Sequence, residues 1–343
     1  MAPPDHEGFA APPPKPARGK ALVGVALKAS VSTGLIAYIL HAQVDNVDEI
    51  WRAISAADPW LLTAAFLLHI FGYLLCSWRW QILLRAQGFV VPLLELIRAY
   101  TIGIFFNSFL PGVMSGDFMR ALDISDRVAS YTQSLLILFV ERLTGLIALL
   151  ILALVALPLM GWDMVEETGI LWILVAVGAG VLVISLTFLS APFRRLATWL
   201  SGMGPLRRLQ GIVAKVTETS AVFSDRMGPV YGCVAISVIF QANVVLHFYL
   251  IAEALDFGVP VIFYFALIPV SLFIMMVPIS INGIGVREQA FIVLFGTFGV
   301  PASSAISLAW IALAFVLVQA VAGGVVFALR RKAARPDAYK QGA

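Results

Sequence analysis

Long apolar runs constrain the fold of this 343-residue chain more than any other feature. Several runs of about 20 or more mostly apolar residues recur along it, and a helix of about 20 residues crosses a hydrocarbon core about 30 Å thick. Apolar residues make up 60% of the sequence and charged residues 13%, whereas about a quarter of a soluble domain is charged. The alternating pattern of membrane strands does not appear. The sequence therefore predicts an all-α polytopic membrane protein.

The runs divide the chain into spans, tails and two segments left over. We expect about six full transmembrane helices, at 21–41, 60–84, 131–157, 169–189, 228–251 and 303–329. Residues 20–332 then form an integral membrane domain between two cytoplasmic tails, a disordered Pro-rich one at 1–19 and a short one at 333–343. At about 191–227, basic residues with apolar ones at intervals of three or four favour a helix on the inner membrane surface or a plain cytoplasmic connector.

The two leftover segments, about 92–128 and 261–300, share one pattern of Pro, Gly and Arg. In each, Gly follows Pro by five positions and Arg follows Gly by four, after an apolar arm of about 17 residues. Helix breakers at membrane depth are tolerated where they line a cavity, as in the broken helices of transporters. We therefore expect hinges beside a substrate site, at Pro111, Gly116, Pro278, Gly283 and Gly285.

The distribution of charges predicts the topology. Lys and Arg gather in both tails, around the first leftover segment and at 191–227, while the remaining connections are mostly acidic. Since basic loops face the cytoplasm, both termini should be cytoplasmic. Six crossings fit this pattern if each leftover segment is a re-entrant broken-helix hairpin, one dipping from each side, in an inverted repeat. The competing topology makes both apolar arms ordinary spans and places Arg120 and Arg127 outside unless a charged crossing follows.

Charged residues inside the membrane form the candidate site. Glu141 and Arg142 fall near the middle of the third predicted span, where an unpaired charge costs about 2.5–3.5 kcal/mol or more. Arg120, Arg287 and Glu288 are the residues expected to compensate them. Three arginines against two glutamates leave one positive charge, which suits a phosphate headgroup because a guanidinium presents a fork of donors. The alternative is a set of internal salt bridges.

Polar residues near the two breaks belong to the same predicted site. They are Asn107, Ser115, Ser280 and Asn282. Their side chains could hydrogen-bond the headgroup, or they could satisfy backbone groups that the two prolines free. The sequence leaves both roles open.

Other chemistries have little support. The histidines stand singly, so no metal site is expected, and for His69 and His247 packing is favoured over a proton relay. Cys76 and Cys233 are interpreted as buried apolar residues, and Arg79, between two tryptophans, as an anchor at the membrane interface. No cofactor and no nucleic-acid partner are expected.

Four short motifs occur in order along the chain: Asn107-Ser-Phe-Leu-Pro-Gly112, Gly116-Asp-Phe-Met-Arg120, Val140-Glu-Arg-Leu143 and Gly283-Ile-Gly-Val-Arg-Glu288. Together they resemble the transmembrane domain family named after lysylphosphatidylglycerol synthase, whose members include flippase-like proteins. The resemblance covers nearly the whole chain after the Pro-rich tail.

The resemblance implies a multi-pass protein of the bacterial cell inner membrane, or its archaeal equivalent, that moves or handles lipid-linked molecules. It also implies that the family's characteristic Arg and Glu positions are carried here by Arg120, Glu141, Arg142, Arg287 and Glu288. Two-domain synthases of the family carry a soluble aminoacyltransferase domain after the membrane part. This chain ends soon after residues 330–332, so lysyl transfer is not expected of it.

The leading hypothesis is a lipid translocase that binds a phospholipid or lipid-linked substrate at a mid-membrane arginine and glutamate site. One alternative is a membrane-embedded enzyme of lipid, glycolipid or hopanoid assembly with Glu141 or Glu288 as base. Another is a scaffold that recruits lipid-biosynthesis enzymes through the basic segment. Small-residue patches at 178–180 and 323–324 could support internal packing or a homodimer.

Overall fold

The computed structural model describes residues 47–109, 115–128, 131–159, 170–189, 227–276, 280 and 283–329, with a few isolated residues elsewhere. Within these ranges the chain is helical and contains no strand, as expected of an all-α membrane protein. Four helices are long and apolar enough to cross a membrane: α3 (Pro59–Ala86), α6 (Tyr131–Ala156), α11 (Met227–Ala254) and α14 (Ala302–Leu329). A fifth apolar helix, α8 (Ile170–Leu189), lies beside α6.

These five helices lie where the sequence predicts spans. Their ends differ from the predicted ones by at most the three residues between Ile251 and Ala254. Both tails and nearly all of the first predicted span and of 191–227 lie outside the described residues, so those assignments stay predictions.

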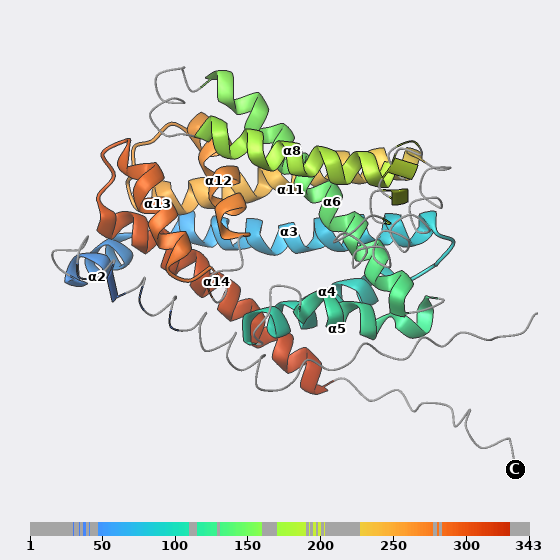
Figure 1. Ribbon diagram of the computed structural model, residues 1–343. Coiled ribbons are helices and arrows are strands. Elements are labelled where there is room, and N and C mark those ends of the chain that lie inside the picture. The colour runs from blue at the N-terminus through green and yellow to red at the C-terminus, as the bar shows by residue number, and fades with distance from the viewer. Residues whose placement is uncertain are drawn as a thin grey trace, which may run out of the picture.

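The long helix α3 begins with a favourable N-cap, Asp58, followed by Pro59. Asp58 accepts hydrogen bonds from the backbone N–H groups of Trp60 (2.7 Å) and Leu61 (3.3 Å), and Pro59 occupies the first helical turn, where its missing N–H is no loss. The Asp58 N–H donates to the carbonyl of Ala254 at 3.1 Å. The start of α3 is thereby attached to the end of α11, and the two helices run alongside each other (Figure 1).

A short helix, α2 (Val47–Ala56), lies in a connection where the sequence analysis placed no helix. Ile50 is fully buried against Ile306 of α14, and the Ser307 hydroxyl donates to the Ile50 carbonyl at 3.3 Å. Ten residues are too few for a span, so no long apolar run marks this element in the sequence.

Each Pro/Gly/Arg segment consists of two short helices around its break. The first contains α4 (Leu93–Phe109) and α5 (Ser115–Asp123), followed by a 3₁₀ turn at Ser125–Arg127; the second contains α12 (Val261–Met275) and α13 (Val286–Gly296). In Figure 1 the α12–α13 pair lies toward the end where α3 begins, and the α4–α5 pair extends toward the end where α3 stops. That either pair enters and leaves a membrane on one side stays a prediction.

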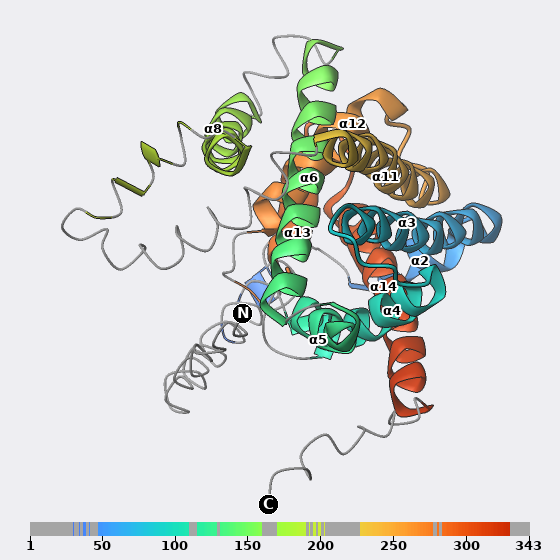
Figure 2. The ribbon, with the colours of Figure 1, turned by 90° about the vertical axis from the view of Figure 1, so that its right-hand side faces the viewer.

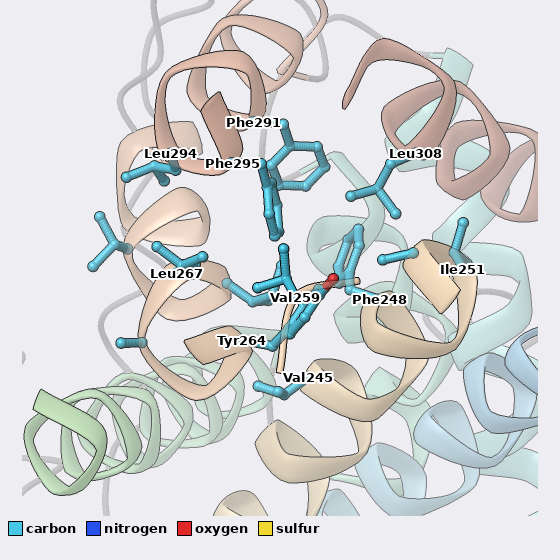
Figure 3. Packing of buried hydrophobic residues seen from close by; sticks show 14 of the residues in the cluster. Val245, Phe248, Ile251, Val259, Tyr264, Leu267, Phe291, Leu294, Phe295 and Leu308 are labelled. Carbon is cyan, nitrogen blue, oxygen red and sulfur yellow. The ribbon is translucent and has the colours of Figure 1, made fainter. Parts of the chain in front are cut away.

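Two apolar clusters fix these helix pairs. One joins α12 and α13 to α6, α11 and α14 through buried aromatic side chains: the rings of Phe248 and Phe291 lie 5.5 Å apart, and those of Tyr264 and Phe295 lie 5.3 Å apart (Figure 3). The other joins α4 and α5 to α3 and α6 around Trp80, which is fully buried. Helix α6 takes part in both clusters, and in Figure 2 it runs from beside α12 to the end of α5.

Glycines let α14 approach α4 closely. A Cβ atom on Gly323 would lie 2.1 Å from the Thr101 carbonyl oxygen, and one on Gly324 would lie 2.9 Å from the Phe105 ring. The small-residue patch at 323–324 therefore takes part in internal packing. A homodimer stays a prediction.

Candidate functional site

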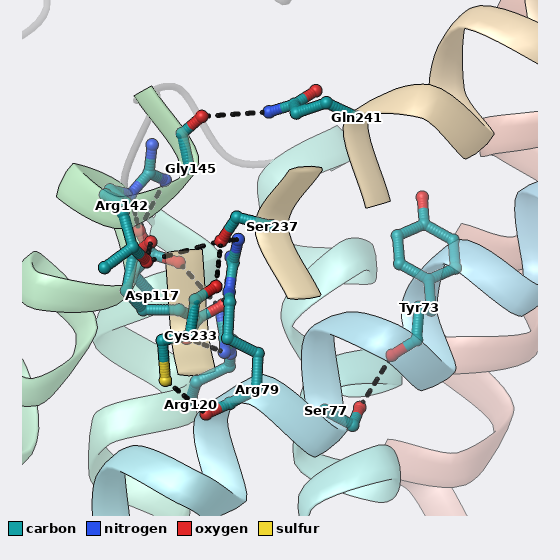
Figure 4. Close-up of polar contacts among 12 residues, drawn as sticks. Tyr73, Ser77, Arg79, Asp117, Arg120, Arg142, Gly145, Cys233, Ser237 and Gln241 are labelled. Atoms are coloured by element: carbon teal, nitrogen blue, oxygen red, sulfur yellow. Dashed lines mark hydrogen bonds and ion pairs between the residues drawn. The ribbon is translucent and has the colours of Figure 1, made fainter. Parts of the chain in front are cut away.

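A buried carboxylate on α6 is the centre of an ion network. Glu141 is 2% exposed and accepts hydrogen bonds at both oxygens, from Arg79 Nη2 at 3.0 Å and from Arg120 Nη2 at 2.8 Å. Figure 4 shows the side chains of these two arginines close to each other and to Asp117. The two arginines come from α3 and α5 and are each 5% exposed. Pairing two cations with one anion greatly reduces the cost of holding these charges away from water.

Asp117 extends the network. One carboxylate oxygen of Asp117 accepts from Arg120 Nη1 at 3.3 Å, and the other is contacted by the guanidinium of Arg142. The Arg142 side chain, 37% exposed, is much more open than those of Arg79 and Arg120, which are 6% exposed. Three arginines and two carboxylates thus form one group with a formal charge of one positive unit.

Local sequence positions Arg120. Its guanidinium lies 4.4 Å from the Trp80 ring and 4.0 Å from the Tyr100 ring, close enough for favourable cation–π contact with both. A Cβ on Gly103 would lie 2.8 Å from Arg120 Cγ, and a Cβ on Gly116 would lie 2.2 Å from the Gly103 carbonyl oxygen. The two glycines therefore let α4 and α5 meet while leaving room for the arginine between them.

The network faces a cavity of about 580 Å³, here called the arginine cavity. Helices α3, α4, α5, α6, α8, α11 and α12 contribute to its wall. Its polar lining includes Arg79, Asn107, Arg120, Glu141 and Arg142. Most of the remaining lining is apolar. Such a space can hold an anionic polar group beside the arginines with an apolar part beyond it.

A second cavity of about 250 Å³, here called the histidine cavity, is lined by His69, Tyr73, Asn243, His247 and Arg287 together with apolar residues. The two cavities share part of their lining, namely Phe240, Val244, Leu272 and Met275. The two cavities are therefore neighbours that adjoin at apolar residues.

Arg287 and Glu288 form a pair of their own at the start of α13. Glu288 Oε2 accepts from the Gly285 N–H at 2.7 Å, and Arg287 Nη2 lies 3.4 Å from Glu288 Oε1. Arg287 is 6% exposed, and its Nε has no hydrogen-bond partner among the described residues. The pair is formally neutral, and Arg287 lines the histidine cavity.

The family model described as the lysylphosphatidylglycerol synthase TM region matches residues 25–335 of the sequence. The chain belongs to this family. No curated protein and no solved structure matches the chain. Membership agrees with the apolar helices in making this a membrane protein and indicates a lipid-related function.

The charged residues of the predicted site do not all lie at one cavity. Arg120, Glu141 and Arg142 line the arginine cavity, and their role in binding a substrate stays a prediction. The expectation that Arg287 helps to compensate Glu141 is wrong, because Glu141 is held by Arg79 and Arg120 while Arg287 pairs with its neighbour Glu288. The observed network also has one excess positive charge, but Arg79 and Asp117 take the places predicted for Arg287 and Glu288.

Arg79 is the main correction to the sequence analysis. It was predicted to anchor α3 at the membrane interface, yet it is buried and also donates to Ser237 Oγ at 2.8 Å. Its position follows Cys76 by three residues and Tyr73 by six, so all three share a helix face that looks into the protein. That spacing was the available signal.

Asp117 was missed altogether. It lies inside the Gly116–Arg120 motif, but an acidic residue in the first turn of a helix is common enough to need no special explanation. The charge balance gives the better clue, because the predicted site already carried more arginines than acids.

The residues at the first break satisfy backbone groups, one of the two roles left open by the sequence. Asn107 Oδ1 accepts from the Gly116 N–H at 2.7 Å, and Ser115 Oγ donates to the Phe106 carbonyl at 3.0 Å. Asn107 also lines the arginine cavity, so its headgroup role stays a prediction. Pro111, Pro278 and Asn282 lie outside the described residues.

The predicted hinge glycines differ in geometry. Gly283 and Gly285 have φ of 74° and 86°, a region that disfavours residues with a side chain. Gly116 instead sits at the helix contact described above. Movement at any of the three stays a prediction.

Two of the histidines form a pair, so the prediction that all of them stand singly is wrong. His69 Nδ1 lies 3.3 Å from His247 Nε2, although 178 positions separate the two residues. Helices α3 and α11 bring them together, and no local sequence pattern could show that contact. Among the described residues, no cluster of three or more His, Cys, Asp or Glu side chains could hold a metal ion.

Proposed function

We propose that this protein binds an anionic headgroup of a phospholipid or lipid-linked molecule in the arginine cavity and moves it between the leaflets of the bacterial inner membrane. The observation that carries the proposal is a buried ion network with one excess positive charge lining a cavity of about 580 Å³. A guanidinium offers paired donors that match phosphate oxygens. The family's lipid-related function supports the same conclusion.

Arg142 is the residue proposed to meet the headgroup first. Its side chain is the most exposed of the three arginines, whereas Arg79 and Arg120 are already committed to Glu141. A phosphate oxygen could join the contact between Arg142 and Asp117 without uncovering Glu141. The acyl chains would remain in the lipid.

The two pairs of short helices are the proposed moving parts. Each is interrupted between its two helices, and broken helices of this kind carry substrate sites in transporters. Alternating exposure of the arginine cavity to the two leaflets would follow from rocking of the halves, with both termini on the cytoplasmic side.

The geometry gives less support to an embedded enzyme. A general base must reach its substrate and have an oxygen able to take the proton. Both oxygens of Glu141 accept from arginines, and Glu288 is fully buried, caps the α13 N-terminus and pairs with Arg287. The scaffold hypothesis depends on residues 191–227, which lie almost wholly outside the described residues.

Native mass spectrometry of the purified full-length protein tests headgroup binding. We expect wild type to retain phosphatidylglycerol in preference to phosphatidylcholine, and Arg142→Gln to weaken that retention about 10- to 100-fold, since a hydrogen bond to a charged group contributes about 1.5–3 kcal/mol. Arg142 is the best choice because Glu141 keeps both of its partners in this variant.

Arg127→Gln is the matched control. Arg127 is an exposed arginine that pairs with Glu95 at 3.0 Å outside the arginine cavity, so its loss should leave lipid retention unchanged. Movement of a fluorescent phosphatidylglycerol across reconstituted vesicles should fall in Arg142→Gln alone. Equal retention and equal movement in the two variants would refute the proposal.

A further inference from the structure

The contact between His69 and His247 belongs to a continuous chain of hydrogen bonds across two helices. His69 Nε2 lies 3.0 Å from the Tyr73 hydroxyl, His69 Nδ1 lies 3.3 Å from His247 Nε2, and His247 Nδ1 lies 2.9 Å from the Ala65 carbonyl oxygen. His247 is 3% exposed, and both rings line the histidine cavity. Four residues thus engage every ring nitrogen of the pair.

The groups at the two ends of this hydrogen-bond chain determine which ring nitrogens carry the protons. A carbonyl oxygen can only accept, so His247 Nδ1 carries a proton and donates to Ala65. In a neutral ring, His247 Nε2 is then the acceptor, and His69 Nδ1 donates to it. His69 Nε2 is left as an acceptor, which the Tyr73 hydroxyl satisfies. The uncharged chain therefore has one consistent direction.

One added proton can be accommodated without breaking the chain. If it binds at His69 Nε2, this nitrogen becomes a donor and the Tyr73 hydroxyl turns from donor to acceptor, while the contact between the rings is kept. If the charge moves to His247, the inter-ring hydrogen bond simply reverses. A second proton would place two N–H donors face to face at 3.3 Å. The geometry thus admits one proton and opposes two.

The surroundings of the pair contain few other charges. From α3 the titratable neighbour is Tyr73, from α4 it is Tyr100, whose ring is 5.5 Å from that of Tyr73, and from α13 it is Arg287, which lines the same cavity. The α11 and α14 neighbours lining the cavity are Asn243 and apolar residues. No carboxylate lines this cavity among the described residues, so proton binding depends mainly on the two rings and on Arg287.

We propose that His69 and His247 form a site that binds a single proton between α3 and α11. When the proton binds, the Tyr73 hydroxyl changes from donor to acceptor in its hydrogen bond with His69 Nε2. The site differs from the arginine cavity and would exist whether or not a lipid is bound.

The position of the site gives the proton a route to influence the arginine cavity. The Tyr73 ring packs on Tyr100, and the Tyr100 ring lies 4.0 Å from the Arg120 guanidinium. A change at the Tyr73 hydroxyl is therefore two aromatic contacts away from a residue that holds Glu141. Coupling of the proton to headgroup movement rests on the proposed function, whereas the proton site itself does not.

Magic-angle-spinning NMR of the full-length protein with ¹⁵N-labelled histidine in phosphatidylcholine bilayers tests the site. On lowering the pH, the ring signals of His69 and His247 should change together as one proton is gained by the pair, and His69→Gln should abolish the shared signal. His41→Gln, at an exposed position, should leave it intact. Tyr73→Phe, which removes only a hydroxyl, should keep the single proton and alter the His69 Nε2 signal.

Gain of two protons by the folded pair, gain of none, or independent titration of the two rings would each overturn the proposal. A separate experiment decides the coupling: movement of fluorescent phosphatidylglycerol in vesicles with and without an imposed pH gradient. The wild-type rate should change several-fold with the gradient, and the His247→Gln rate should not change relative to its own basal rate. Wild-type movement indifferent to the gradient would refute the coupling, and a complete lack of movement would refute the proposed function, while the NMR result stands in either case.

Discussion

Glu141 is the residue on which the buried arginines depend. Its two oxygens hold Arg79 and Arg120, so Glu141→Gln would leave two cations with too little compensation. We expect this variant to lose about 3–5 kcal/mol of stability, the usual result of removing one partner from a buried ion pair. Thermal unfolding in detergent, followed by tryptophan fluorescence, provides the measurement.

Glu95→Gln is the comparison for Glu141→Gln. It removes the same charge from an exposed pair with Arg127, where the loss should be about 1 kcal/mol or less. If the two variants unfold at the same temperature, the network around Glu141 does not stabilise the protein.

At the residue scale, the sequence predicts which charges are out of place but not which partners they choose. Glu141 and Arg142 are conspicuous because the surrounding span is apolar. The partners of Glu141 are 62 and 21 positions away, so their choice depends on how α3 and α5 pack. Arg79 was misassigned because adjacent tryptophans are also typical of a membrane interface.

The contact between α14 and α4 depends on a small residue. Gly323→Ala would place a methyl group 2.1 Å from the Thr101 carbonyl oxygen, so the helices must separate. We expect a loss of about 1–3 kcal/mol or more, typical of overpacking, read as a lower unfolding temperature.

Gly180→Ala on α8 is the matched substitution, because nothing lies within 4 Å of the added atom. It should be neutral or stabilise the helix by about 0.5–1 kcal/mol. A similar fall in both variants would point to a general intolerance of alanine and contradict a specific close approach.

At the element scale, apolar length and helix breakers identify most of the fold. The helices α3, α6, α8, α11 and α14 follow from apolar runs of about 20 residues, and the divided segments follow from their Pro and Gly. Helix α2 could not be found this way, since it is short and is stabilised by burying Ile50 against α14. Tertiary contact, not local pattern, explains it.

The topology of the whole molecule is open to a direct test. If α4–α5 is re-entrant, Val90→Cys and Asp126→Cys, at exposed positions on either side of this pair, should react with an impermeant maleimide from one face of the membrane. Val261→Cys and Thr297→Cys, which bracket α12–α13, should both react from the opposite face. Native Cys76 and Cys233 are buried and should contribute little background.

Inverted and right-side-out vesicles supply the two faces for this labelling. Reaction of Val90→Cys and Asp126→Cys from different faces would show that α4 crosses completely and would favour the competing topology. Whether a segment crosses the membrane or returns to the same side cannot be predicted from composition, because loop charges constrain only the ends of each segment.

The excess positive charge of the arginine network has an electrical consequence. Moving one elementary charge through the whole membrane potential involves about 2.3 kcal/mol per 100 mV. An empty network that shifts through part of that field would carry its unit of charge with it, whereas a network loaded with a singly charged anionic headgroup would move as a neutral body. In the proposed cycle, voltage would then act on the return of the empty protein and leave the loaded step almost untouched.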